Sequence, residues 1–192
     1  MRRFGNNYGG YFLPENCLST YSVVYSFGLG EDASFDIDLF LAFGCNIHVF
    51  DPTPKSIMYY AKNLSKHQFL QFHPYGIWTD DGYQRFYFPQ DETHVSCSIN
   101  NIQHTDSFFV GHVKKLSTIM YELGNRSIGL LKLDIEGAEL EVLIEIINSG
   151  IYPSIICVEC HSNIDPGDIS HILFKVGYQL IYKDHNNLTF QL

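Results

Sequence analysis

Acidic side chains and a histidine follow two apolar runs in the second half of the chain. Asp134 and Glu136 come directly after the first run, and Glu159 and His161 come after the second. Such groups can ligate a hard cation, orient a hydroxyl group or accept its proton. His161 is the preferred general base, because an unperturbed imidazole titrates near neutral pH. For Glu136 the alternative is helix capping, since a carboxylate stabilises any helix N-terminus. We predict that these four residues form the catalytic group.

A pair of glycines, Gly28 and Gly30, follows an apolar run near the start of the chain. Glycine lets the backbone turn tightly and approach a ligand, and a helix that begins after the turn offers free N–H groups. Asp51 lies about 20 residues further on, a spacing suited to accepting both hydroxyls of a ribose. Together these three residues predict a site for a nucleotide-derived cofactor.

The glycine pair alone leaves the identity of that cofactor open. With Ala33 it satisfies the G-x-G-x-x-G/A fingerprint of dinucleotide-binding proteins, so an NAD-dependent oxidoreductase is an alternative. Two observations weigh against NAD. The chain has little room for a separate substrate domain, and Glu31 and Asp32 lie where a pyrophosphate would sit. Negative charge at that place is better suited to a sulfonium and an amino group.

These residues must be positioned by an alternation of short β-rich runs with amphipathic helices. That order predicts an α/β fold with helices on both faces of a mostly parallel sheet. Ligands of such sheets bind at the carboxyl ends of the strands, which is where the candidate residues fall. We predict a single domain over residues 1–192, with seven strands of which the last is antiparallel. The predicted strands are 23–26, 47–50, 69–72, 128–133, 155–158, 179–182 and 189–192.

Helices are predicted between these strands. The first spans 34–43 and ends near Gly44, and Thr53 with Pro54 predicts the cap and first turn of the second. The apolar faces of the later helices follow from residues spaced three and four apart. The predicted faces are Ile57, Tyr60, Ala61 and Leu64; Leu116, Ile119, Met120 and Leu123; Leu140, Leu143, Ile144 and Ile147; and Ile169, Ile172, Leu173 and Val176.

The segment 83–113 has no clear helical period and is rich in Ser, Asn, His and aromatic residues. A stretch of this length in a compact domain indicates an insertion or a lid. We expect it to cover the substrate. Within it, His94, Ser96 and Ser98 could donate hydrogen bonds to a polar substrate, although serine-rich stretches are more often ordinary loops.

The composition excludes several classes of partner. A formal net charge of -9 and a pI of about 5.3 leave no positive field for a nucleic-acid backbone. No run of 18 apolar residues predicts a membrane span, and no export signal is visible. Five scattered cysteines indicate reduced thiols and a cytoplasmic location. Cys157 and Cys160 form a C-x-x-C pair that could be redox-active or bind a metal, but their apolar setting favours ordinary strand residues.

Several of these segments together resemble the FkbM-like methyltransferases, including the subgroup related to methyltransferase-like protein 24. The resemblance covers nearly the whole chain, and its most specific motif is Leu131–Glu139. The other matching segments are Tyr25–Asp32, Ser34–Asp36, Phe50–Pro54, Gly76–Trp78 and Val158–His161.

The resemblance implies a three-layer, Rossmann-like class I methyltransferase fold. It also implies S-adenosylmethionine as methyl donor and transfer to a hydroxyl oxygen, often on a sugar or small metabolite. Ser26 stands where many class I methyltransferases have an acidic residue for the donor's amino group, so Glu31 or Asp32 would substitute for it. The implied donor contacts are Gly28, Gly30 and Glu31 at the methionine end, Asp51 at the ribose, and Gly76, Ile77 and Trp78 at the adenine. Ser26 and Asp134 are also expected among the donor-binding residues.

Methyl transfer requires alignment of the acceptor with the S–CH₃ bond and exclusion of water. We therefore expect the lid to close over an acceptor hydroxyl near Asp134 and His161, one of which accepts its proton. Glu136 and Glu159 would hold the acceptor, directly or through a divalent cation, and no residue is assigned as a metal ligand at this point. A donor-binding protein of the same fold without turnover is the non-enzymatic alternative.

Overall fold

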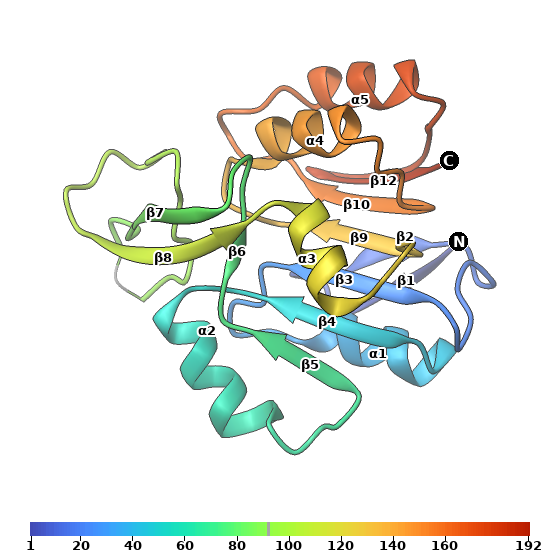
Figure 1. The fold of residues 1–192 in the computed structure, drawn as a ribbon, viewed down its shortest axis with the longest axis horizontal. Coiled ribbons are helices and arrows are strands. Elements are labelled where there is room, and N and C mark those ends of the chain that lie inside the picture. Colours follow the sequence, from blue (N-terminus) through green and yellow to red (C-terminus); the bar gives the residue numbers. More distant parts are fainter. Residues whose placement is uncertain (92) are drawn as a thin grey trace.

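The computed structural model describes residues 1–91 and 93–192. Its centre is a seven-stranded sheet in the order β11-β12-β10-β9-β3-β4-β5 (Figure 1). Six strands are parallel, and β12 runs antiparallel between β10 and β11. The predicted α/β fold and its antiparallel last strand are thus confirmed. The strands are β3 (Val23–Phe27), β4 (Asn46–Phe50), β5 (Leu70–His73), β9 (Leu130–Leu133), β10 (Ile155–Glu159), β11 (Gln179–Asp184) and β12 (Asn187–Gln191).

Helices cover both faces of this sheet and complete three layers. Side chains of α3, α4 and α5 pack with one face into one hydrophobic core. Side chains of α1 and of the π-helical turn η1 pack with the opposite face into a second core. The helices are α1 (Ser34–Phe43), α2 (Pro54–Tyr59), η1 (Tyr60–Leu64), α3 (Leu116–Leu123), α4 (Glu139–Asn148) and α5 (Pro166–Lys175). None of the helices among the described residues has the length and apolarity needed to cross a membrane.

Strand β10 shows why the central strands are almost entirely apolar. Ile155 and Cys157 belong to one core, whereas Ile156 and Val158 belong to the other, because successive side chains point to opposite faces. Cys157 is fully buried and, like Cys160, carries a free thiol. The structure therefore agrees with the expectation that both are strand-region core residues.

Two predicted helix faces are confirmed only in part. In α4, Leu143 is buried and Leu140 and Ile147 pack against the core as predicted, but Ile144 is exposed. The buried face begins with Glu139 and continues through Val142, Leu143 and Ile146 at spacings of three and four. In the segment from α2 to η1, Ser56 and Leu64 are buried, whereas Ile57 and Ala61 face solvent. There the helix changes to π geometry at Tyr60, which shifts the periodicity.

Two small sheets were not predicted. A hairpin of β1 (Arg2–Phe4) and β2 (Tyr11–Leu13) packs into the same core as α1. A three-stranded sheet joins β6 (Gly76–Ile77), β7 (Gly82–Tyr87) and β8 (Phe108–Lys114). It lies beyond the carboxyl ends of the central strands (Figure 1). The segment 83–113 thus consists of most of β7 and β8 and the loop that joins them.

Candidate active site

A pocket of about 320 Å³ opens at the carboxyl ends of β3, β4, β9 and β10. Its position agrees with the general rule for parallel α/β sheets. Twelve of the residues predicted from the sequence to contact a ligand line it: Gly28, Gly30, Glu31, Asp32, Asp51, Gly76, Ile77, Ser96, Asp134, Glu136, Glu159 and His161. The fold therefore brings together residues from distant parts of the chain in one cavity.

The glycine turn packs directly against the end of β9. Gly28 has a φ of +87°, and a Cβ built on it would lie 2.0 Å from the backbone oxygen of Asp134. Its N–H donates to the carbonyl of Phe50 in β4. Only glycine combines this backbone conformation with so close an approach.

Asp51 holds the glycine turn in place. Its carboxylate accepts hydrogen bonds from the N–H groups of Leu29 and Gly30, at 2.9 and 3.0 Å. It also accepts the N–H and hydroxyl of Thr53 and the hydroxyl of Ser56. The side chain of Thr53 thus makes no capping hydrogen bond to the helix, contrary to expectation. In the sequence, this network could have been recognised from Thr53 and Ser56, whose hydroxyls follow Asp51 by two and five residues.

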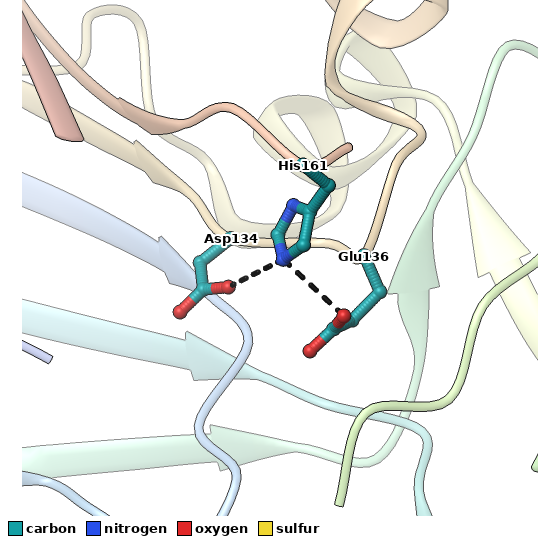
Figure 2. A group of neighbouring side chains, drawn as sticks. All are labelled: Asp134, Glu136 and His161. Atoms are coloured by element: carbon teal, nitrogen blue, oxygen red, sulfur yellow. Dashed lines mark ion pairs between the residues drawn. The ribbon is translucent and has the colours of Figure 1, made fainter. Parts of the chain in front are cut away.

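On the other side of the pocket, Asp134, Glu136 and His161 point toward one another (Figure 2). Nε2 of His161 lies 3.2 Å from Oε2 of Glu136 and 3.9 Å from Oδ1 of Asp134. Nδ1 of the same ring is 2.8 Å from Oε1 of Glu139. Glu139 is completely buried and also accepts the N–H groups of Ile135 and Gly137. It therefore fixes both the imidazole and the turn that carries Glu136.

These contacts change the expected role of His161. Burial alone would lower its pKa, but the hydrogen bonds to Glu136 and Glu139 outweigh burial and raise the pKa to about 11. An imidazole held between carboxylates in this way keeps its proton at neutral pH. The arrangement therefore disfavours His161 as the general base.

Two further charged groups complete this side of the pocket. Lys132, which the sequence reading overlooked, is buried in β9 and donates to the carbonyl of Gly28 and to Asp134, at 2.7 and 3.1 Å. In the sequence, Lys132 could have been recognised as a functional candidate because it interrupts an otherwise apolar strand. The side-chain carboxyl group of Glu159 has no hydrogen-bond or ion-pair partner in the described part of the chain, and burial followed by repulsion from Asp134 raises its pKa to about 7.

The pocket is covered by two segments. Val95, Ser96, Cys97 and Ile99 line it from the loop between β7 and β8. Tyr8 and Gly9 line it from the hairpin of β1 and β2, which the sequence did not reveal because each strand has three residues. Part of the segment 83–113 thus lines the pocket, and its action as a lid stays a prediction.

Four predicted site residues have other positions. The hydroxyl of Ser98 donates to the carbonyl of Glu136 at 2.6 Å, so it ties the covering loop to the β9–α4 turn. His94 is exposed and lies 3.7 Å from Asp91. Ser26 is fully buried in β3, and Trp78 packs against the core beneath α3, α4 and α5. None of the four lines the pocket.

Comparison with known proteins assigns the family. A model described as the methyltransferase FkbM domain matches residues 30–180, which is most of the chain. The chain belongs to the FkbM methyltransferase family. Its FkbM domain contains the glycine turn's Gly30, Asp51 and both polar segments after β9 and β10. The fold is accordingly the Rossmann-like fold of class I methyltransferases.

Individual relatives of this FkbM domain are distant. The human probable methyltransferase-like protein 24 is 30% identical over 122 residues, which is 62% of this chain and 26% of that protein. A structure of an rRNA methylase from Streptococcus thermophilus aligns over 92% of this chain and 90% of its own, with 11% identity and a TM-score of 0.48. A precorrin-6y C5,15-methyltransferase from Geobacter metallireducens GS-15 aligns over 93% and 85%, with 13% identity and a TM-score of 0.46.

Proposed function

We propose that this FkbM-family chain transfers a methyl group from S-adenosylmethionine to a hydroxyl oxygen of a small-molecule acceptor, such as a sugar or metabolite. The observation that carries the proposal is the division of one pocket into two parts. A glycine turn and Asp51 form what we call the donor half. Across from it, the acceptor half consists of Asp134, Glu136, Glu159 and His161.

In the donor half, Gly28, Gly30 and Glu31 would contact the methionine part of the donor. Asp51 would accept the ribose hydroxyls, and Gly76 and Ile77 would lie against the adenine. A carboxylate has about four lone-pair positions, and five donors already point at Asp51. Binding of both ribose hydroxyls would therefore displace the hydroxyls of Thr53 and Ser56 from this carboxylate. Ser26 and Trp78 do not line the pocket, so they would affect donor binding only by supporting the residues that pack on them.

The charge of the pocket favours this donor over NAD. Seven carboxylates line it: Glu31, Asp32, Asp36, Asp51, Asp134, Glu136 and Glu159. Lys132 is the sole Lys or Arg among the described lining residues, and its ammonium group is already bonded to Gly28 and Asp134. A sulfonium cation is attracted to such a pocket, whereas a pyrophosphate would be repelled.

In the acceptor half, Glu159 is the carboxylate placed to take the proton. Asp134 is paired with Lys132 and Glu136 with His161, whereas Glu159 has no such partner in the described residues. The acceptor oxygen would attack the methyl carbon as its proton passes to Glu159. The C–S bond breaks with its electron pair on sulfur, which gives S-adenosylhomocysteine and the methyl ether. The loop that carries Ser96 would exclude water.

The test is incubation of the protein with isotopically labelled donor and a panel of hydroxylated metabolites, followed by mass spectrometry of labelled products. We expect one product class, and a Glu159→Gln variant with about 100-fold lower turnover and unchanged donor binding. Glu15→Gln, at an exposed position away from the pocket, is the matched control. Donor binding without transfer to any member of the panel would instead support a donor-binding protein without turnover.

A further inference from the structure

We propose that Asp134, Glu136 and His161 bind a divalent first-row transition-metal ion such as Mn²⁺, with Glu139 as a positioning residue. The three candidate ligands come from two neighbouring strand ends, since Asp134 and Glu136 follow β9 and His161 follows β10. All three line the pocket. Figure 2 shows their polar ends converging on one point.

The spacing of the ligand atoms fits one ion. One nitrogen of His161 and one oxygen from each carboxylate all lie within 4.8 Å of one another. Atoms bound at about 2.1 Å to a common metal lie roughly 3 to 3.5 Å apart. The distance from Nε2 to Glu136 is already 3.2 Å, and that to Asp134 is 3.9 Å. Small rotations of the side chains would therefore complete the set.

Glu139 supplies the second observation. A metal-bound histidine characteristically donates its other ring N–H to a carboxylate, which fixes the tautomer and the ring plane. Oε1 of Glu139 lies 2.8 Å from Nδ1 of His161, which is the geometry of an N–H donated to a carboxylate. Nε2 faces Glu136 and Asp134, and an ion bound there would take the place of the Nε2 proton, which is released to solvent. Since Glu139 is completely buried and accepts two backbone N–H groups, the imidazole is held before any ion binds.

The excess of negative charge around Asp134 and Glu136 also favours binding of a cation. Four carboxyl groups meet here, from Asp134, Glu136, Glu139 and Glu159, and they outnumber the two cationic groups that they face, the ammonium group of Lys132 and the protonated ring of His161. Carboxylates brought together with partial burial repel one another unless positive charge is added. A divalent ion between Asp134 and Glu136 would supply that charge.

The donor set selects the kind of ion. Ca²⁺ and Mg²⁺ prefer all-oxygen sites, whereas an imidazole together with carboxylates suits Mn²⁺, Fe²⁺, Co²⁺ and Zn²⁺. Three protein ligands leave coordination positions open toward the pocket. In the methyl transfer proposed above, on which this role rests, an acceptor hydroxyl would bind there and become easier to deprotonate. Metal binding itself is independent of that proposal.

The test is titration of the protein with MnCl₂, followed by electron paramagnetic resonance of the free ion. We expect saturable binding of one Mn²⁺ per chain and electron spin-echo modulation from a coordinated imidazole nitrogen. His161→Gln should remove the nitrogen modulation and weaken binding at least tenfold. Glu139→Gln should weaken binding about 10- to 100-fold. Glu141→Gln, an exposed change in the same first turn of α4, should leave the affinity unchanged.

Thermal unfolding separates loss of the site from loss of the fold. Wild-type protein should melt at a higher temperature with Mn²⁺, and folded His161→Gln should not. Binding without imidazole modulation, or binding that His161→Gln leaves intact, would overturn the metal site. Titration with S-adenosylhomocysteine in the same samples reports on the donor half alone, so failure of the metal site and failure of the proposed function give different results.

Discussion

Asp51 and Asp134 both stand at the carboxyl end of a parallel strand, yet their carboxylates are held in different ways. Asp51 accepts its five hydrogen bonds from backbone N–H groups and hydroxyls, none of which is charged. Asp134 lies 3.1 Å from the ammonium group of Lys132 and 3.9 Å from the ring of His161. The strand-end carboxylate of the donor half is thus held by neutral groups and that of the acceptor half by charged ones.

This difference predicts different consequences of substitution. The donor half depends on backbone geometry, so changes there should reduce the free energy of unfolding together with ligand affinity. The acceptor half depends on charges at the pocket surface, so a change such as Glu159→Gln should reduce turnover and leave the fold intact. The following experiments test whether the two halves behave in these distinct ways.

The largest effect on stability is expected for Gly28→Ala. A Cβ at this position meets the backbone oxygen of Asp134 at 2.0 Å, and the residue has a positive φ. We expect a loss of about 3 kcal/mol or more in the free energy of unfolding, measured by urea denaturation. Gly150→Ala is the control, because its φ is +71° but nothing lies within 4 Å of the added Cβ. It should cost about 1 kcal/mol. Equal costs for both variants would contradict the tight packing of the glycine turn on β9.

An intermediate effect is expected from acid, through His48 in β4, the strand that leads into Asp51 of the donor half. His48 is buried and its Nδ1 lies 3.1 Å from Nε2 of His73. Burial, with a smaller contribution from His73, lowers the pKa of His48 to about 4. The unfolded chain therefore takes up a proton on His48 at a higher pH than the folded chain does. The contribution of neutral His48 to the free energy of unfolding is fully present above about pH 6.5 and is lost as the pH falls toward 4.

The measurement is the free energy of unfolding of wild type and His48→Phe at pH 7 and pH 5. Between these values the wild type should lose about 2 kcal/mol relative to the variant, since phenylalanine has no proton to gain. His171→Gln, an exposed histidine on α5, should follow the wild type. If the difference between wild type and His48→Phe is independent of pH, the buried neutral histidine pair is not present.

The smallest effect is expected where the covering loop meets the acceptor half. Ser98→Ala removes the hydroxyl that donates to the carbonyl of Glu136 and should cost about 1 kcal/mol locally. Hydrogen exchange of the amides at residues 95–100 should accelerate. Ser107→Ala, at an exposed position near the start of β8, should leave exchange unchanged. Unchanged exchange in Ser98→Ala would show that the loop is held by other contacts.

The sequence predicted the central sheet well because burial on both faces makes β9 and β10 apolar except at Lys132 and Glu159. It failed where a polar residue sets the helical face, as at Glu139 of α4, because apolar periodicity does not register a buried carboxylate. The β1–β2 hairpin escaped prediction for a different reason. Its strands have three residues each, which is too short for an alternating pattern to be recognised.

The candidate site was predictable at strand ends and less so elsewhere. The topology alone brings Gly28, Asp51 and Asp134 to one rim, so their spacing in the sequence was sufficient. The roles of His161 and Ser98 depend on which neighbours their side chains contact in the folded chain. Those neighbours are Glu139 and the carbonyl of Glu136. The turn between β9 and α4 places them, and no sequence pattern predicts the geometry of that turn.

The central claim is that the donor half binds S-adenosylmethionine, and calorimetric titration with S-adenosylhomocysteine tests it most directly. We predict binding of one molecule per chain in the micromolar range, and no binding of NAD. Gly30→Ala should weaken the affinity, because the added Cβ would lie 3.3 Å from Val95 and narrow the pocket. Saturable binding of NAD without any binding of S-adenosylhomocysteine would contradict the account.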